Sequence, residues 1–279
     1  MSAPAPRRKG AWALRAGAGI VAALALVALL SLVWTPQSPS KMQILLKLKP
    51  PLAAGWLGTD QYGRDIASLL MVGAWNSLSI AVLSVLIGAG IGTVLGLAVA
   101  ARGRGIVAAA VLRGCDVLFA VPPILSAMML GAFIGPGRFT AIIAIASFMV
   151  PVFTRIAFAS ASQIWARDYV LAARACGKGP LRISIEHVAP NIATPVIVQV
   201  TIQLGLAILT EAGLSFLGLG LPPPAPTWGR MLAEAQTFLR PAPWLAILPG
   251  LAIALAVLGF NLIGDGLRDR FDPKREASP

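Results

Sequence analysis

Six long runs of apolar residues alternate with shorter polar segments along this sequence. The runs cover residues 16–34, 71–101, 117–137, 139–160, 189–210 and 241–264. Each has close to the ~20 residues that a helix needs to cross the hydrocarbon core of a bilayer. Arg155, near one end of the fourth run, is the only charged residue inside them. The pattern predicts an all-α polytopic membrane protein with six transmembrane helices.

Prolines, glycines and flanking charges define the limits of these runs. Residues 212–229 are uncharged too, but their prolines and glycines make a poor helix, so this stretch is predicted to be a loop. Pro122-Pro123 predicts a kink near the start of the third run. The first run is longer than the apolar core of a cleaved signal peptide, which favours an uncleaved span.

Two regions follow from this division. Residues 1–70 are predicted to hold a cytoplasmic tail, the first transmembrane helix and an extracytoplasmic segment. Residues 71–279 are predicted to form a core of five transmembrane helices.

Residues 165–191 form a charged insert between two apolar runs, with the sequence WARDYVLAARACGKGPLRISIEHVAPN. Helical patterns over 166–176 and 181–188 flank the turn Gly177-Lys178-Gly179-Pro180. Glycine permits a tight backbone there, and proline suits the first position of the following helix. The insert is therefore predicted to be a helix–turn–helix outside the bilayer.

Composition and charge support a membrane protein and orient it. Of the 279 residues, 57% are hydrophobic and only 12% are charged, whereas a soluble domain carries about 25% charge. The net charge of +12 does not indicate nucleic-acid binding, because the basic residues are spread over short segments between the runs. With the N-terminus inside, 16 of the 23 lysines and arginines lie in cytoplasmic segments. The positive-inside rule thus predicts both termini and the insert on the cytoplasmic side.

No group of residues predicts catalysis, a metal site or a bound cofactor. His187 is the only histidine, so neither a His-rich zinc site nor a Ser-His-Asp triad with a spare base is available. Gly177-Lys178 invites a phosphate-loop interpretation, but Ala172 replaces the first glycine of that motif and Gly179 replaces its Ser or Thr. If ATP drives this protein, another subunit must bind it.

Polar residues near the spans leave two interpretations open. Asp116, Glu211 and Asp265 lie at the ends of runs, which favours a structural role over a place in a transport path. Gln199, Gln203 and Thr210 fall within about 40° on one helix face. Such a stripe either lines a water-filled path or hydrogen-bonds a neighbouring helix, and Gln203 is the best single candidate for the path.

Small residues in the spans predict close packing. Gly88, Gly92 and Gly96 recur every four residues and form a smooth stripe against which another helix can pack, within this chain or in a second subunit. Cys115 and Cys176 are too few for a disulfide framework and are predicted to be small buried side chains.

The insert resembles the cytoplasmic loop of the inner-membrane permease subunits of ATP-binding-cassette (ABC) importers, in the dipeptide, oligopeptide and nickel branch. That loop reads Glu-Ala-Ala, three residues, Gly, nine residues, Ile-x-Leu-Pro. Ala172, Ala173, Gly177 and Pro190 fall in register, whereas Leu171, His187 and Ala189 depart from the pattern. Residues 57–65 (LGTDQYGRD), 211–231 (EAGLSFLGLGLPPPAPTWGRM) and 264–274 (GDGLRDRFDPK) also resemble this branch. The resemblance covers residues 55–275 in order.

The resemblance implies a type I importer permease fold and a non-catalytic subunit in a bacterial cytoplasmic membrane. The implied partners are membrane lipid, a second homologous permease, an extracytoplasmic solute-binding protein and two ATPase subunits that hold ATP and Mg²⁺. The insert would dock on an ATPase through its small residues, with a basic rim. That rim comprises Arg167, Arg174, Lys178 and Arg182.

The implied substrate is a di- or oligopeptide, with nickel or a metal chelate as the alternative. A more remote alternative is a secondary transporter driven by an ion gradient. That alternative predicts carboxylates in the middle of spans and repeats of similar hydropathy.

Overall fold

The structure is a computed structural model that describes residues 7–103 and 105–271. In chain order the elements are α1 (Arg7–Leu30), η1 (Ile44–Leu46), α2 (Ile66–Arg102), α3 (Ile106–Ala120), α4 (Pro123–Ile134), α5 (Arg138–Trp165), α6 (Asp168–Ala175), α7 (Pro180–Ile183), η2 (Ser184–Val188), α8 (Ala189–Phe216), α9 (Trp228–Ala235), η3 (Gln236–Phe238) and α10 (Trp244–Phe271). The predicted all-α class is confirmed. Arg104, Lys274 and Arg275, which contributed to the charge count, lie outside the described residues.

Five of the described helices are long and apolar enough to cross a membrane. They are Ala11–Leu30, Ile66–Arg102, Arg138–Trp165, Pro180–Phe216 and Trp244–Phe271. The third predicted span is instead a bent pair, because α3 and α4 meet at 88°. Pro123 begins α4 and lacks the N–H that would continue α3, so the chain breaks where the sequence predicted only a kink. Six spans result when the bent pair counts as one.

The segment predicted as a loop after the fifth span is shorter than expected. α8 continues to Phe216, because Ala212, Leu214 and Ser215 are buried and this packing outweighs the weak helix propensity of the glycines nearby. The chain then turns until Thr227, whose side-chain oxygen accepts a hydrogen bond from the backbone N–H of Arg230 and caps α9. The prediction of a loop over 212–229 was therefore wrong at both of its ends.

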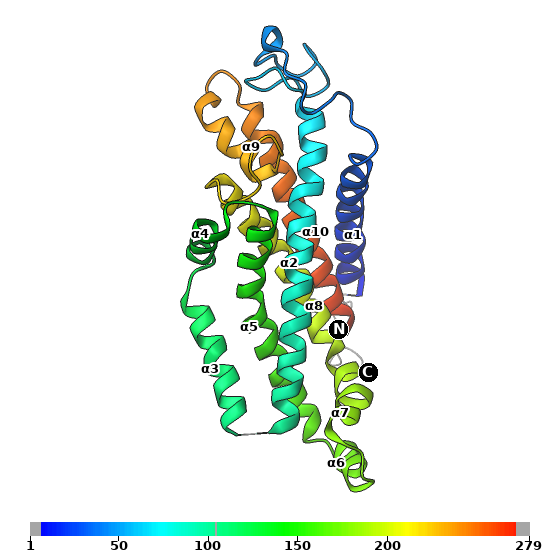
Figure 1. Ribbon diagram of the computed structural model, residues 1–279. Helices are drawn as coiled ribbons and strands as arrows, with labels where there is room; N and C mark the ends of the chain where they lie inside the picture. The colour runs from blue at the N-terminus through cyan, green and yellow to red at the C-terminus, as the bar shows by residue number, and fades with distance from the viewer. Residues whose placement is uncertain (1–6, 104, 272–279) are drawn as a thin grey trace.

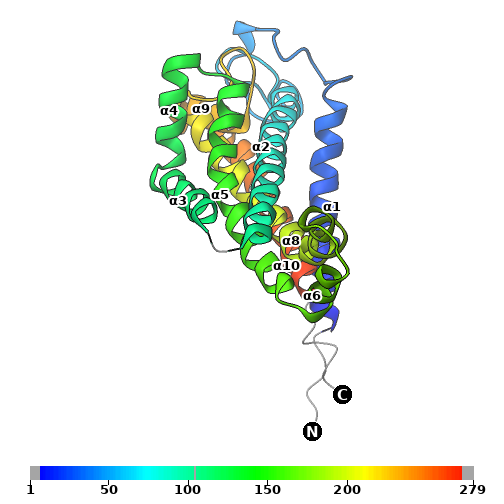
Figure 2. The ribbon, with the colours of Figure 1, turned by 60° about the horizontal axis from the view of Figure 1, so that its bottom comes forward.

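The helices form an elongated bundle around α2 and α5 (Figure 1). α1 packs on α10 at one side, and the bent pair α3–α4 covers α5 at the other. α6 and α7 extend from one end of the bundle, whereas residues 35–65 and α9 cover the opposite end (Figures 1 and 2). The charge count places the α6–α7 end in the cytoplasm.

α2 and α5 approach each other closely along the glycine stripe. A Cβ atom on Gly88 would lie 2.3 Å from the Cβ of Met149, and one on Gly96 would lie 2.6 Å from the carbonyl oxygen of Thr154. At Gly92 the corresponding distance to the carbonyl oxygen of Val150 is 2.5 Å. No side chain fits at these distances, so the stripe serves a contact inside this chain rather than one between subunits.

We expect Gly92→Leu to disrupt the bundle. The added side chain must push α5 away, which in a packed interior costs about 1–3 kcal/mol or more. Thermal unfolding of the purified protein in detergent should therefore shift to lower temperature. Gly90→Leu is the matched control, since a Cβ at Gly90 meets nothing within 4 Å. Equal unfolding temperatures for the two variants would contradict the close contact.

Candidate functional site

The insert is attached to the bundle by a hydrophobic cluster, here called the insert core. Its buried members are Ala100 of α2, Ala157 and Ala161 of α5, Val170 and Ala173 of α6, Ile183, Val188, and Ile192 of α8. Val170 and Ala173 are three residues apart and so lie on the same face of α6. The insert core therefore joins α6 directly to α5, and through α7 and η2 it joins the insert to α2 and α8.

α6 ends in a turn that requires Gly177. The N–H of Gly177 donates to the carbonyl oxygen of Arg174 (2.9 Å), and the N–H of Lys178 donates to that of Ala173 (3.2 Å). This is a Schellman motif, and its glycine adopts a left-handed φ of +80°. A Cβ at Gly177 would meet no atom within 4 Å. The requirement for glycine here is therefore conformational, and the position faces open space.

Glu186 forms ion pairs with two basic residues of the insert. Its Oε2 lies 2.6 Å from Lys178 Nζ, and its Oε1 lies 2.5 Å from Arg182 Nε. Lys178 Nζ also lies 3.2 Å from His187 Nε2. The sequence analysis selected Lys178, Arg182 and His187 but missed Glu186. The spacing of Arg182 and Glu186, i and i+4 on a helix, was the signal that could have found it.

The second helix of the insert continues into the membrane without a break. α7 begins with Pro180 at the predicted position and passes through the π-helical turn η2 into α8. The N–H of Ala189 bonds to the carbonyl oxygen of Ser184, five residues back. Pro190 follows in the first turn of α8, and because it has no N–H it cannot donate to a carbonyl of the preceding turn of this continuous helix.

Only some of the small residues of the insert form an accessible surface. Ala172, Ala175 and Gly177 are exposed, whereas Ala173 is 8% exposed and belongs to the insert core. The expectation that Ala173 contributes to a docking surface is thus wrong. Cys176, predicted to be buried, is exposed at the end of α6, whereas Cys115 is buried as expected.

The three residues of the polar stripe on α8 differ in their exposure. Gln203 is only 6% exposed, and its Oε1 has no hydrogen-bond partner in the described part of the chain. Gln199 and Thr210 are half-buried, and the Thr210 hydroxyl donates to the carbonyl oxygen of Leu206 (2.8 Å). Gln203 lies inside this chain's own bundle, so its place in a transport path stays a prediction.

The three acidic residues near the spans differ in their surroundings. Asp116 pairs with Arg155 across α3 and α5, and Asp265 is exposed on α10. Glu211 is fully buried, because α8 continues past it, and accepts a hydrogen bond from Ser215 Oγ (2.6 Å). Glu211 and Asp265 end their apolar runs, but α8 and α10 continue past them to Phe216 and Phe271, so neither residue lies at the end of a helix.

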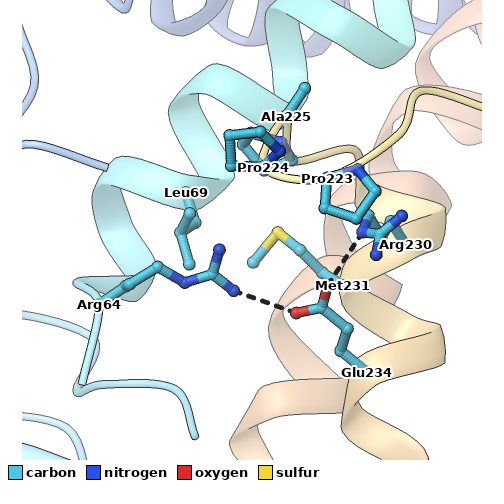
Figure 3. A pocket seen from close by; sticks show the side chains of 9 residues that line it. Arg64, Leu69, Pro223, Pro224, Ala225, Arg230, Met231 and Glu234 are labelled. Carbon is cyan, nitrogen blue, oxygen red and sulfur yellow. Dashed lines mark hydrogen bonds and ion pairs between the residues drawn. The ribbon is translucent and has the colours of Figure 1, made fainter. Parts of the chain in front are cut away.

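The opposite end of the molecule is held together by buried charges. Arg64 Nε lies 2.5 Å from Asp60 Oδ2, and Arg64 Nη2 lies 3.1 Å from Glu234 of α9. Gln61 and Arg230 also donate to Glu234, at 3.0 and 2.9 Å. Figure 3 shows Arg64 and Arg230 converging on Glu234 beside residues 222–226, here called the proline loop. The cavity between them, about 20 Å³, is too small for a solute.

Hydrogen bonds fix the proline loop and the start of α9 to α2, and α2 in turn to α5. Asn76 of α2 donates through Nδ2 to the carbonyl oxygen of Pro226 (2.7 Å) and accepts through Oδ1 from Arg138 of α5 (2.6 Å). The Trp228 indole donates to the carbonyl oxygen of Leu70 (3.1 Å). Residues 57–65 and 211–231, two of the stretches that carry the sequence resemblance, therefore form one assembly at this end.

Among the described residues, a bundle of five single-helix spans and one bent pair, with a helical insert joined to it at the end that the charge count places in the cytoplasm, is the architecture of a membrane transport permease. Residues 92–277 match the family described as binding-protein-dependent transport system inner membrane component. This chain belongs to that family, and so to the permease subunits of ABC importers in the bacterial inner membrane.

Similar proteins include permeases with peptide substrates. The chain is 40% identical to a dipeptide transport system permease protein of Alkalihalophilus pseudofirmus, over 92% of this chain and 84% of that protein. It is 43% identical to a di/tripeptide transport system permease protein of Pseudomonas aeruginosa, covering 86% and 80%. It is also 43% identical to a glutathione transport system permease protein of Pectobacterium atrosepticum, covering 80% and 74%.

Among solved structures, an inward-facing MetNI methionine ABC transporter is similar. The TM-score is 0.55 at 18% identity, over 71% of this chain and 96% of that chain. At this identity the likeness establishes the fold alone, which is the type I importer fold that the sequence resemblance implied.

We expect Arg64→Met to destabilise the protein by about 3 kcal/mol, since it leaves the buried Asp60 carboxylate without its cation. Arg230→Met removes the other ion pair of Glu234, which is more exposed, and should cost less than about 1 kcal/mol. Denaturation of both variants in detergent, followed by tryptophan fluorescence, checks the difference. Equal losses would show that burial of the Asp60–Arg64 pair has no energetic consequence.

Proposed function

We propose that this chain forms part of the membrane pathway of an ATP-driven importer of di- or oligopeptides, with residues 165–191 as the segment that receives the movement of partner ATPases. Two ATPase subunits would bind ATP and Mg²⁺, and this chain would bind no cofactor. A second, homologous permease would complete the pathway. An extracytoplasmic solute-binding protein would deliver the substrate.

The insert core is the observation that carries this proposal. Because Val170 and Ala173 belong to one buried cluster in which α6 packs on α5 and α7, and α7–η2 packs on α2 and α8, a displacement of α6 must displace these helices or open a cavity. Creating a cavity in a packed core costs several kcal/mol, so movement of the helices is the cheaper response. α6 can therefore transmit a push from a docked partner to the spans.

The peptide substrate is supported by the relatives, three of which are permeases for dipeptides, di/tripeptides or glutathione. Nickel or a metal chelate is the alternative that the same branch allows. Uptake of a labelled dipeptide and of ⁶³Ni²⁺ by the complete transporter distinguishes these substrates.

The energy source is tested on the complete transporter reconstituted in proteoliposomes with its binding protein. Substitution of the catalytic glutamate in the partner ATPases should abolish uptake, whereas a protonophore should leave ATP-driven uptake unchanged. Uptake that survives the ATPase substitution but collapses with the protonophore would identify an ion-gradient-driven transporter instead.

We expect Gly177→Trp to reduce uptake at least tenfold while the protein still inserts into the membrane. The substitution places a large ring on the exposed turn that a partner must approach, and it strains a left-handed residue by about 1–2 kcal/mol. Coupling is measured as the ratio of substrate transported to ATP hydrolysed.

Two control variants separate bulk from strain. Gly177→Ala introduces the backbone strain with little bulk, and Gly179→Trp introduces the bulk at a residue with φ of −71°. A docking role predicts a larger loss for Gly177→Trp than for Gly177→Ala. Normal uptake by Gly177→Trp would refute the assignment of this turn.

A further inference from the structure

Two adjoining hollows lie at the cytoplasmic end of the bundle. The first is a groove of about 520 Å³ between the last turns of α2 and the segment α7–η2. The second is a cavity of about 320 Å³ between the end of α5 and the turn of the insert. Ala101 and Pro180 line both hollows, so the two are neighbours.

The groove is apolar and uncovered in this chain. Val94, Leu97 and Ala98 of α2 face Leu181 and Ile185 across it. Val94 is 66% exposed, Leu181 73% and Ile185 63%. Covering large aliphatic side chains of this kind is worth about 25 cal/mol per Å² of apolar surface. The volume exceeds that of an engineered cavity of about 150 Å³ that binds benzene, so a hydrocarbon chain fits.

The adjoining cavity and the mouth of the groove are basic. Arg174 and Lys178 line the cavity, and Arg102 lines the groove. Lys178 is paired with Glu186, the acidic residue of this neighbourhood, which Arg182 also binds. Within residues 7–103 and 105–271, no salt bridge engages Arg102 or Arg174. The two arginines thus remain available to an external anion.

Trp165, at the end of α5, also lines the cavity, and its side chain bears on which ligand would bind there. Tryptophan is enriched where a membrane protein meets the headgroups of a bilayer. Basic pockets between transmembrane helices on the cytoplasmic side bind the headgroups of anionic lipids. The hollows also lie at the end of the bundle that the charge count places in the cytoplasm.

We propose that the groove and the cavity together bind one anionic phospholipid of the cytoplasmic leaflet. An acyl chain occupies the groove, and the phosphate lies beside Arg102 and Arg174. An apolar helix of a second subunit would fill the groove but leave both arginines without an anion. An acidic side chain of a partner would fill the cavity but leave the groove empty. A phospholipid can fill both hollows at once, because its acyl chain and its anionic headgroup belong to one molecule.

Native mass spectrometry of the full-length chain in mild detergent tests this site. Phosphatidylglycerol and phosphatidylcholine with identical acyl chains are titrated separately. We expect one phosphatidylglycerol to bind more than tenfold more tightly than phosphatidylcholine. A basic residue near a bilayer contributes about 1 kcal/mol, so Arg102→Gln and Arg174→Gln should each weaken phosphatidylglycerol binding about fivefold. Each substitution should weaken phosphatidylcholine binding less, because the choline cation of that lipid offsets the charge of its phosphate. Arg113→Gln, an exposed arginine of α3 outside both hollows, is the matched control.

Two further variants test the position of the acyl chain. Ala98→Trp fills the groove and should reduce the binding of both lipids, whereas Ile91→Trp, two turns away on the same face of α2, should not. Leu181→Gln repeats the test at an exposed position that the fold does not require.

Three results would overturn the proposal. The first is equal affinity for the two lipids, and the second is phosphatidylglycerol binding that neither arginine variant weakens. The third is unchanged lipid binding by Ala98→Trp and Leu181→Gln. If Ala98→Trp releases a co-purified second permease and leaves lipid binding unchanged, a helix of that permease occupies the groove instead of a lipid.

Discussion

Close packing of α2 against α5 is the constraint on which the rest of the structure depends. In a bilayer, helices associate through van der Waals contact rather than through a hydrophobic drive, so the absence of side chains at Gly88, Gly92 and Gly96 determines how near they come. α2 also contacts α1 and α8, and α5 contacts α3, α4 and α8. The position of this pair therefore decides where the other spans can pack, and its cytoplasmic ends supply Ala100, Ala157 and Ala161 to the insert core.

The two ends of the bundle are stabilised by different interactions. At the outer end, segments far apart in the sequence are joined by buried charges and hydrogen bonds, as between Arg64 and Glu234 or between Asn76 and Pro226. These contacts fix the geometry because each buried group would be costly to leave unpaired. At the cytoplasmic end the long-range contact is hydrophobic, and the ion pairs of Glu186 are local and solvated. That end consequently combines a firm attachment to the spans with a surface that is available to partners.

Much of this architecture could be predicted from local patterns. The apolar runs located the spans because a helix is the structure that satisfies its own backbone in hydrocarbon. The turn at Gly177 and the start of α7 at Pro180 followed from backbone preferences that act within a few residues. The same local reasoning missed the extension of α8 to Phe216 and the burial of Glu211. Both depend on the packing of α8 against α2, which ends more than 100 positions before Glu211.

The sequence by itself determined the class of the protein and the position of the insert in the chain, and it predicts the orientation of the helices. These properties follow from hydropathy, charge and short-range conformational preference, which each segment carries alone. Only the tertiary structure decided that Ala173 is an anchor rather than a contact surface, that Gln203 lies inside the bundle, and that Arg64 joins two distant segments. It also decided that an apolar groove adjoins a basic cavity beside Ala101. Each of these depends on which side chains meet in space, and the periodicity of one helix does not specify which other segments pack against it.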